Sequence, residues 1–206
     1  MEMTRAFGQL FWGFFFVMLS FRINRFDILP DVVGYILIFL GTGALAMHND
    51  RFRAAKNASI PLMVLAGIDF IASLGGTSPQ RGGIDVPLSN AIGLAVILGI
   101  ATLVLSLLMA YNVCMGIADM AGERGLTDLQ REARSRWYLY LAVTIGGFLF
   151  LLMALAAVRS GNTAGLGALF LLFFIFVIIA AILFLIMLRR AQNQVPKTPL
   201  PGVQPA

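Results

Sequence analysis

The sequence predicts an all-α membrane protein, a polytopic helical bundle of about six transmembrane helices. Hydrophobic residues make up 59% of the 206 residues and charged residues 12%, which is about half the charged share of a soluble domain. A soluble fold of this length could not enclose so much apolar surface in one core. The cations lie at the ends of apolar segments. This pattern is typical of proteins embedded in a lipid bilayer and not of proteins that bind nucleic acid.

Six apolar segments are separated by polar or charged stretches. They cover residues 6–21, 31–47, 60–76, 90–118, 137–158 and 164–188. Because a helix rises about 1.5 Å per residue, roughly 17–25 residues cross a hydrocarbon core of about 30 Å. The last three segments qualify easily, whereas the first two are short. We therefore expect a six-helix transmembrane domain over 1–191, followed by a disordered, proline-rich cytoplasmic tail over 192–206.

Residues that begin or end helices support these limits. Asp31 precedes an apolar run and is suited to cap the second helix. Ser59 is suited to cap the third helix, with Pro61 tolerated in its first turn. Gly122 and Gly125 are expected to end the fourth helix.

The linker before the fifth segment has its own helical pattern. Thr127-Asp128-Leu129-Gln130 reads as a capping box that opens a helix. Leu126, Leu129, Ala133 and Trp137 recur at helical spacing, opposite a face of charged residues. The pattern predicts a cytoplasmic amphipathic helix that lies on the membrane surface and leads into the fifth span.

The distribution of lysine and arginine predicts the orientation. With six spans, one side of the membrane holds Arg5, Arg51, Arg53, Lys56, Arg124, Arg131, Arg134, Arg136, Arg189, Arg190 and Lys197. The opposite side holds Arg22, Arg25, Arg81 and Arg159. Because cytoplasmic loops carry an excess of lysine and arginine, both termini are expected in the cytoplasm.

Two stretches of the chain carry a resemblance to a known family. Phe26–Asp31, followed by Gly34–Ile38, reads Phe-Asp-Ile-Leu-Pro-Asp and Gly-Tyr-Ile-Leu-Ile. These residues resemble the signature of a family of uncharacterised bacterial multipass membrane proteins. Ala133–Tyr140, which ends in Arg-Trp-x-x-Tyr, is similar to a later part of that family's pattern. The resemblance implies a small, all-helical protein of the bacterial cell membrane, and it implies no activity.

Asp69 is the clearest candidate for a functional residue inside a span. A carboxylate at mid-membrane costs about 2.5–3.5 kcal/mol on insertion scales. Asp69 shares a helix face with Ser73, and Thr102 is a candidate neighbour on another helix. One interpretation is an intramembrane proton or cation site built from these three residues. The other is a carboxyl group kept neutral, or hydrogen-bonded to one of the hydroxyl groups.

Four charged residues define a candidate outer linker between the first two helices: Arg22, Arg25, Asp27 and Asp31. They would form a charged vestibule if the linker lines a substrate path. We favour the interpretation that these residues pair with one another and cap helices, since ion pairs and helix caps are common.

The fourth apolar segment carries small residues at intervals of three or four: Ala91, Ala95, Gly99, Thr102, Ser106, Ala110 and Cys114. We call them the small-residue stripe. In lipid, small side chains let helices approach closely, so the stripe is expected to be the central packing seam of the bundle, with a pore or dimer face as the alternative. Leu94, Leu98, Leu105 and Met109 are expected nearer lipid or in the flanking grooves.

Sequence templates for enzymes are missing. The chain has one cysteine and one histidine, and no zinc-protease, nucleophile-elbow, phosphate-loop or dinucleotide motif is present. We therefore expect no catalytic residues, no metal and no cofactor. The favoured function is a non-catalytic membrane component that assembles with other membrane proteins or with itself. The alternative is a small permease or channel-like protein that uses Asp69.

Overall fold

The computed structural model describes residues 2–18, 22–23, 26–27, 31–74, 88–160 and 166–198, without the side chains of 22–27, 69–74, 88–96, 155, 158–160 and 166. Helices dominate this part of the chain: α1 (Glu2–Met18), α2 (Asp31–Leu45), α3 (Asp50–Leu74), α4 (Leu88–Glu123), α5 (Thr127–Ser160) and α6 (Leu166–Gln194). The prediction of an all-α fold is confirmed. One short pairing was not predicted, in which β1 (Arg22–Ile23) lies antiparallel to β2 (Phe26–Asp27).

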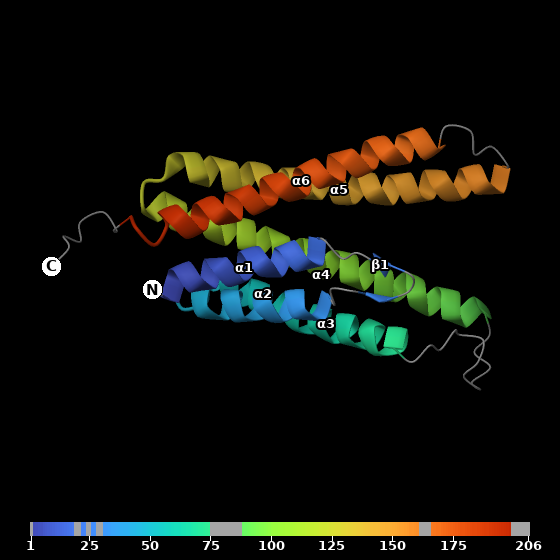
Figure 1. Ribbon diagram of the computed structural model, residues 1–206, viewed down its shortest axis with the longest axis horizontal. Helices are drawn as coiled ribbons and strands as arrows, with labels where there is room; N and C mark the ends of the chain where they lie inside the picture. The colour runs from blue at the N-terminus through green and yellow to red at the C-terminus, as the bar shows by residue number, and fades with distance from the viewer. Residues whose placement is uncertain are drawn as a thin grey trace.

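The six helices alternate in direction. Each helix packs on the next one along the chain, and α1 also packs on α6. The starts of α1, α3 and α5 therefore meet the ends of α2, α4 and α6 at one end of the bundle (Figure 1). A hydrogen bond joins the first and last helices there, because Gln192 Nε2 donates to the backbone oxygen of Thr4 at 3.2 Å. We call this the charged end, for the ion pairs described below.

Three helices contain stretches that are long and apolar enough to cross a membrane, within the described residues. They are Ile97–Glu123, Thr127–Ala154 and Gly167–Gln194. This differs from the six spans expected from the sequence. α1 has 17 residues and α2 has 15, and α3 begins with the charged turns that follow Asp50. Length and composition alone thus support three spans within a six-helix bundle.

The end of α4 is the tight turn that the glycines predict. Gly125 has a φ of +72°. The N–H of Leu126 donates to the Ala121 oxygen at 2.8 Å, and the N–H of Gly125 donates to the Gly122 oxygen at 3.1 Å. These two bonds make a Schellman motif, with the left-handed residue directly after the helix. α5 begins two residues later at Thr127, as expected.

The helix that starts at Thr127 does not lie separately on a membrane surface, so that prediction is wrong. α5 is continuous over 34 residues. Leu129 and Ala133, expected on the lipid side, are buried in the protein core. The apolar face of this segment therefore packs against protein, and the helix continues directly into the apolar stretch.

Two other predicted boundaries also shift. α3 begins at Asp50, about ten residues before the expected cap at Ser59. The Asn49 side chain accepts a hydrogen bond from the Arg51 N–H at 2.8 Å and is therefore the cap. The Ser59 hydroxyl instead donates to the Lys56 oxygen at 2.7 Å. The C-terminal tail does not start at 192, because α6 runs to Gln194 and Val195 is buried.

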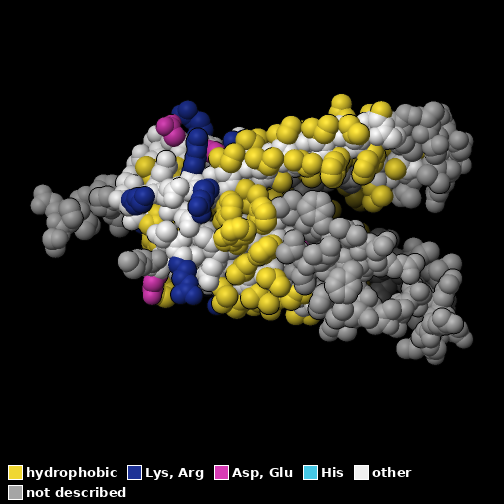
Figure 2. Space-filling model, viewed as in Figure 1, with side chains coloured by type: hydrophobic (Ala, Val, Ile, Leu, Met, Phe, Trp, Pro, Cys, Tyr) yellow, Lys and Arg dark blue, Asp and Glu magenta, His cyan; other side chains and the backbone are white. Residues whose placement is uncertain are grey.

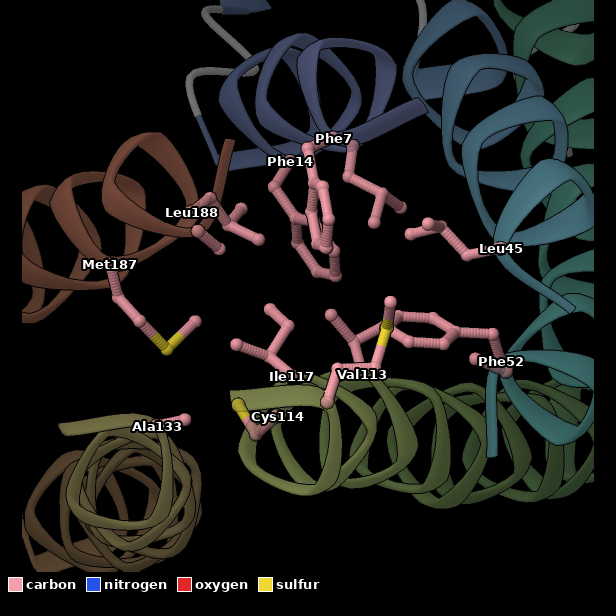
Figure 3. Packing of buried hydrophobic residues seen from close by; sticks show 14 of the residues in the cluster. Phe7, Phe14, Leu45, Phe52, Val113, Cys114, Ile117, Ala133, Met187 and Leu188 are labelled. Atoms are coloured by element: carbon pink, nitrogen blue, oxygen red, sulfur yellow. The ribbon is translucent and has the colours of Figure 1, made fainter. Parts of the chain in front are cut away.

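The buried core lies toward the charged end. Phe7 and Phe14 of α1 face Val113 and Ile117 of α4 (Figure 3). Their neighbours in this cluster include Leu45, Phe52, Cys114, Ala133, Met187 and Leu188, so all six described helices contribute. Among the described residues, α4 supplies more buried hydrophobic side chains than any other helix. α4 is thus central to the bundle on this side.

α1 and α2 approach each other over glycines, backbone against backbone. A Cβ on Gly13 would lie 2.8 Å from the Gly34 oxygen and 2.7 Å from Ile38 Cγ1. A Cβ on Gly41 would lie 2.7 Å from the Ala6 oxygen. The sequence analysis assigned the close helix contact to α4 and missed this one. The seven-residue spacing of Gly34 and Gly41, two helical turns on one face, is the signal that could have found it.

Candidate functional site

Among the side chains that the structure describes, charge and apolar surface are separated. On the face shown in Figure 2, the lysine, arginine, aspartate and glutamate side chains lie at one end, and yellow apolar side chains cover the described surface beyond it. Large apolar side chains are exposed there, including Leu172 at 68% and Ile97 at 65%. The cations that the sequence assigned to one side lie on the helix ends and the turns that form the charged end. The fold thus brings these cations together.

One ion pair at the charged end joins α3 to α4. Arg51 Nε lies 2.6 Å from Asp119 Oδ2, and the guanidinium lies 5.8 Å from the centroid of the Tyr111 ring. That ring meets Trp137 of α5 edge-on, with centroids 5.1 Å apart. The hydrogen bond to Asp119 raises the pKa of Arg51 above its ordinary value, against a smaller opposing effect of burial. The side chain therefore stays charged at neutral pH and links three helices.

A second ion-pair cluster joins α5 to α6. Glu132 Oε1 lies 3.4 Å from Arg136 Nη2, and Glu132 Oε2 lies 2.9 Å from Arg190 Nη1. The Glu132 side chain is only 13% exposed, so these bonds form where solvent screening is weak. Glu132 and Arg136 belong to the charged face opposite Leu129 and Ala133, and their pairing was not predicted from the sequence. Their spacing of four residues on one helix is the signal that could have found the pair.

Two hollows meet at Arg136. The first lies at the charged end, has a volume of about 350 Å³, and is lined by Arg131, Ser135, Arg190, Asp128 and Glu132 in addition to Arg136. The second lies among α1, α5 and α6, has a volume of about 130 Å³, and is mostly apolar. Its lining includes Val143, Val177 and Ala181 together with Arg136. Arg136 thus lines both a polar hollow and an apolar hollow.

The predicted intramembrane site falls mostly outside the described side chains. Asp69 and Ser73 lie on α3, but only their backbone is described. Thr102 lies on α4 and is half-buried. The structure therefore leaves their proximity, and the permease alternative, as predictions.

Thr42 and Ser59 are fully buried, and their hydroxyl groups donate within their own helices. The Thr42 hydroxyl donates to the Ile38 oxygen at 2.7 Å, and Ser59 donates to Lys56 as described above. These hydroxyl groups therefore give no support to a polar path between helices in the described part of the chain.

The outer charged linker is described in part. Arg22 is the strand partner of Asp27, but the side chains of both lie outside the described part, as does Arg25 entirely. Asp31 is the first residue of α2, and its role as the helix cap stays a prediction. The vestibule interpretation stays a prediction.

The small-residue stripe does not face protein along its whole length. Ala110 and Cys114 are fully buried, and Thr102 and Ser106 are half-buried. Gly99 is exposed, and a Cβ there would meet nothing within 4 Å, so the expected packing seam is wrong at this position. Ala91 and Ala95 lie outside the described side chains. Met109, expected near lipid or in a flanking groove, is buried, and Leu98 is exposed.

The stripe changes its surroundings along α4 because the buried core lies toward the charged end. Its C-terminal residues lie within that core. Regular spacing along one helix predicts a common face, but it does not predict how far a neighbouring helix follows that face.

Comparisons with known proteins give no relative for this chain. No protein-family model, no curated protein and no solved structure matches it. The resemblance stated from the sequence therefore stays a prediction.

Proposed function

We propose that this protein is a non-catalytic multipass component of the bacterial cell membrane that assembles with other membrane proteins or with itself. The observation that carries the proposal is the separation of charge from exposed apolar surface (Figure 2). Exposed apolar patches on soluble monomers rarely exceed a few hundred Å². In a membrane, the apolar surface would contact the hydrocarbon core of the bilayer, and the charged end would contact water.

Six crossings with both termini in the cytoplasm fit the alternating helix directions. α1 packs on α6, α3 packs on α4, and α2 packs on both α1 and α3. These shorter helices expose apolar side chains such as Val33, Leu40 and Ile68. At about 1.5 Å per residue, the 17 residues of α1 reach about 26 Å. Local thinning of the bilayer accommodates short helices at modest cost. The excess of cations at the charged end favours its cytoplasmic location.

Assembly is supported by the α5–α6 hairpin. Away from the charged end this pair diverges from α1–α4 (Figure 1), and its helices contact each other through rings such as Phe150 and Phe173, stacked at 5.7 Å. The most apolar window of α5 has no buried residue, and that of α6 has few. A hairpin open on several sides offers more surface to neighbouring membrane helices than a closed bundle does.

A photoreactive amino acid at Leu172 tests the assembly. Leu172 is the most exposed large residue of the hairpin, and Val64 on α3 is a matched exposed control. In native membranes, Leu172 should crosslink to protein, whereas Val64 should form mainly lipid adducts. Two differently tagged copies, expressed together, distinguish self-association from a different partner. Lipid adducts alone at both positions would contradict the proposal.

A further inference from the structure

We propose that the two hollows at Arg136 bind one anionic phospholipid, with its headgroup at Arg136 and Arg190 and its acyl chain between α5 and α6. This inference rests on the proposed membrane location. The lipid would come from the surrounding bilayer, and its phosphate is the chemical group that the site recognises.

The polar hollow has the charge for an anion. Three arginines, Arg131, Arg136 and Arg190, line it against two carboxylates, Asp128 and Glu132. Glu132 bonds to two of the guanidinium groups at once and so holds them side by side. Their planar N–H donors match the geometry of a phosphate.

Arg136 retains a donor for a ligand. Its Nε is buried and has no hydrogen-bond partner among the described residues. A buried unsatisfied donor costs about 1–3 kcal/mol, so a ligand oxygen placed there would relieve a real penalty. Ser135 adds a hydroxyl donor on the same rim.

The apolar hollow extends along α5 away from the charged end. Arg136 and Val143 are seven residues apart on α5 and both line it, which corresponds to about 10 Å along the helix axis. Val177 and Ala181 form the α6 side, and Met18 of α1 closes it. One amphiphile can therefore contact both hollows, whereas a free phosphate would use the first alone.

The test measures lipid retention by native mass spectrometry of the full chain released from detergent. Equal amounts of phosphatidylglycerol and of phosphatidylcholine with the same acyl chains are offered. The wild type should retain phosphatidylglycerol preferentially. Arg190→Gln should reduce that retention about tenfold, because a charge-assisted hydrogen bond is lost. Arg53→Gln is the matched control, since Arg53 is an exposed cation at the same end that pairs with Asp50 and does not line the hollow.

Ala181→Phe tests the acyl chain without changing charge. It should reduce phosphatidylglycerol retention by filling the apolar hollow, with a melting temperature close to that of the wild type. Equal retention of both lipids by the wild type, or an equal loss in Arg53→Gln, would overturn the proposal. Complete displacement of the lipid by excess inorganic phosphate would also overturn it, by showing an anion site without a chain site. Each failure leaves the crosslinking test of assembly unaffected.

Discussion

Gly125 joins α4 to α5 in a left-handed backbone conformation. Residues other than glycine adopt this conformation only with strain. Its φ of +72° lies in the left-handed region. A Cβ there would meet no atom within 4 Å, so the preference for glycine comes from the backbone alone. The turn sets the angle at which Thr127 opens α5, and it thereby positions Glu132 against α6.

Gly125→Ala should lower the free energy of unfolding by about 1 kcal/mol, the usual cost of a left-handed alanine. The measurement is unfolding in mixed micelles of increasing dodecyl sulfate content. Gly125→Asn should cost less, since asparagine tolerates this region better. Equal stability of the alanine variant and the wild type would contradict the assignment of the turn.

At the scale of elements, α1 and α2 approach each other most closely, backbone to backbone, at glycines. This comparison covers the glycines in the described part of the chain. Gly13, Gly34 and Gly41 lie so close to the opposite helix that an added Cβ would meet backbone atoms at 2.7–2.9 Å. Backbone atoms cannot move aside as the end of a flexible side chain can. In a membrane, such close approach supplies much of the attraction between helices.

Gly13→Ala should destabilise the protein by about 1–3 kcal/mol, the usual cost of overpacking. Gly67→Ala is the matched control, because a Cβ at Gly67 meets nothing within 4 Å. That control should be neutral, or stabilising by up to about 1 kcal/mol through helix propensity. The same dodecyl sulfate titration measures both variants. Tolerance of alanine at Gly13 would show that the two helices are farther apart than described.

At the scale of the whole molecule, the alternating helices bring the two ends of the chain together. Thr4 and Gln192 are hydrogen-bonded at the charged end, and the turn between α2 and α3, which contains the exposed Met47, lies at the same end. If the charged end is cytoplasmic, positions 47 and 194 lie on the same side of the membrane. Arg159, near the end of α5, then lies on the opposite side.

Single cysteines at Met47, Gln194 and Arg159 test this topology in a Cys114→Ala background. A membrane-impermeant thiol reagent, applied to intact cells, should label position 159 alone. Positions 47 and 194 should react only after the membrane is opened. Labelling of 159 and 194 from one side would contradict six crossings.

The sequence by itself determined the helical class, the separation of cations from apolar segments, and several helix ends. The end of α4 at Gly125 was predicted correctly because a glycine turn after a helix depends on local residues. The start of α3 was predicted too late. Ser59 and Pro61 are typical of the first turn of a helix, but here both lie inside α3. The resemblance carried by Phe26–Asp31 stays a prediction, because no family model matches the chain.

Tertiary structure alone decided which helix faces meet protein. It placed glycines between α1 and α2, buried Leu129 and Ala133, and joined Glu132 to Arg190. Periodicity shows which residues share a face, but lipid and protein interior are almost equally apolar, so hydrophobicity does not distinguish a face toward lipid from a face toward another helix. That distinction depends on which helices pack together, and only the fold specifies it.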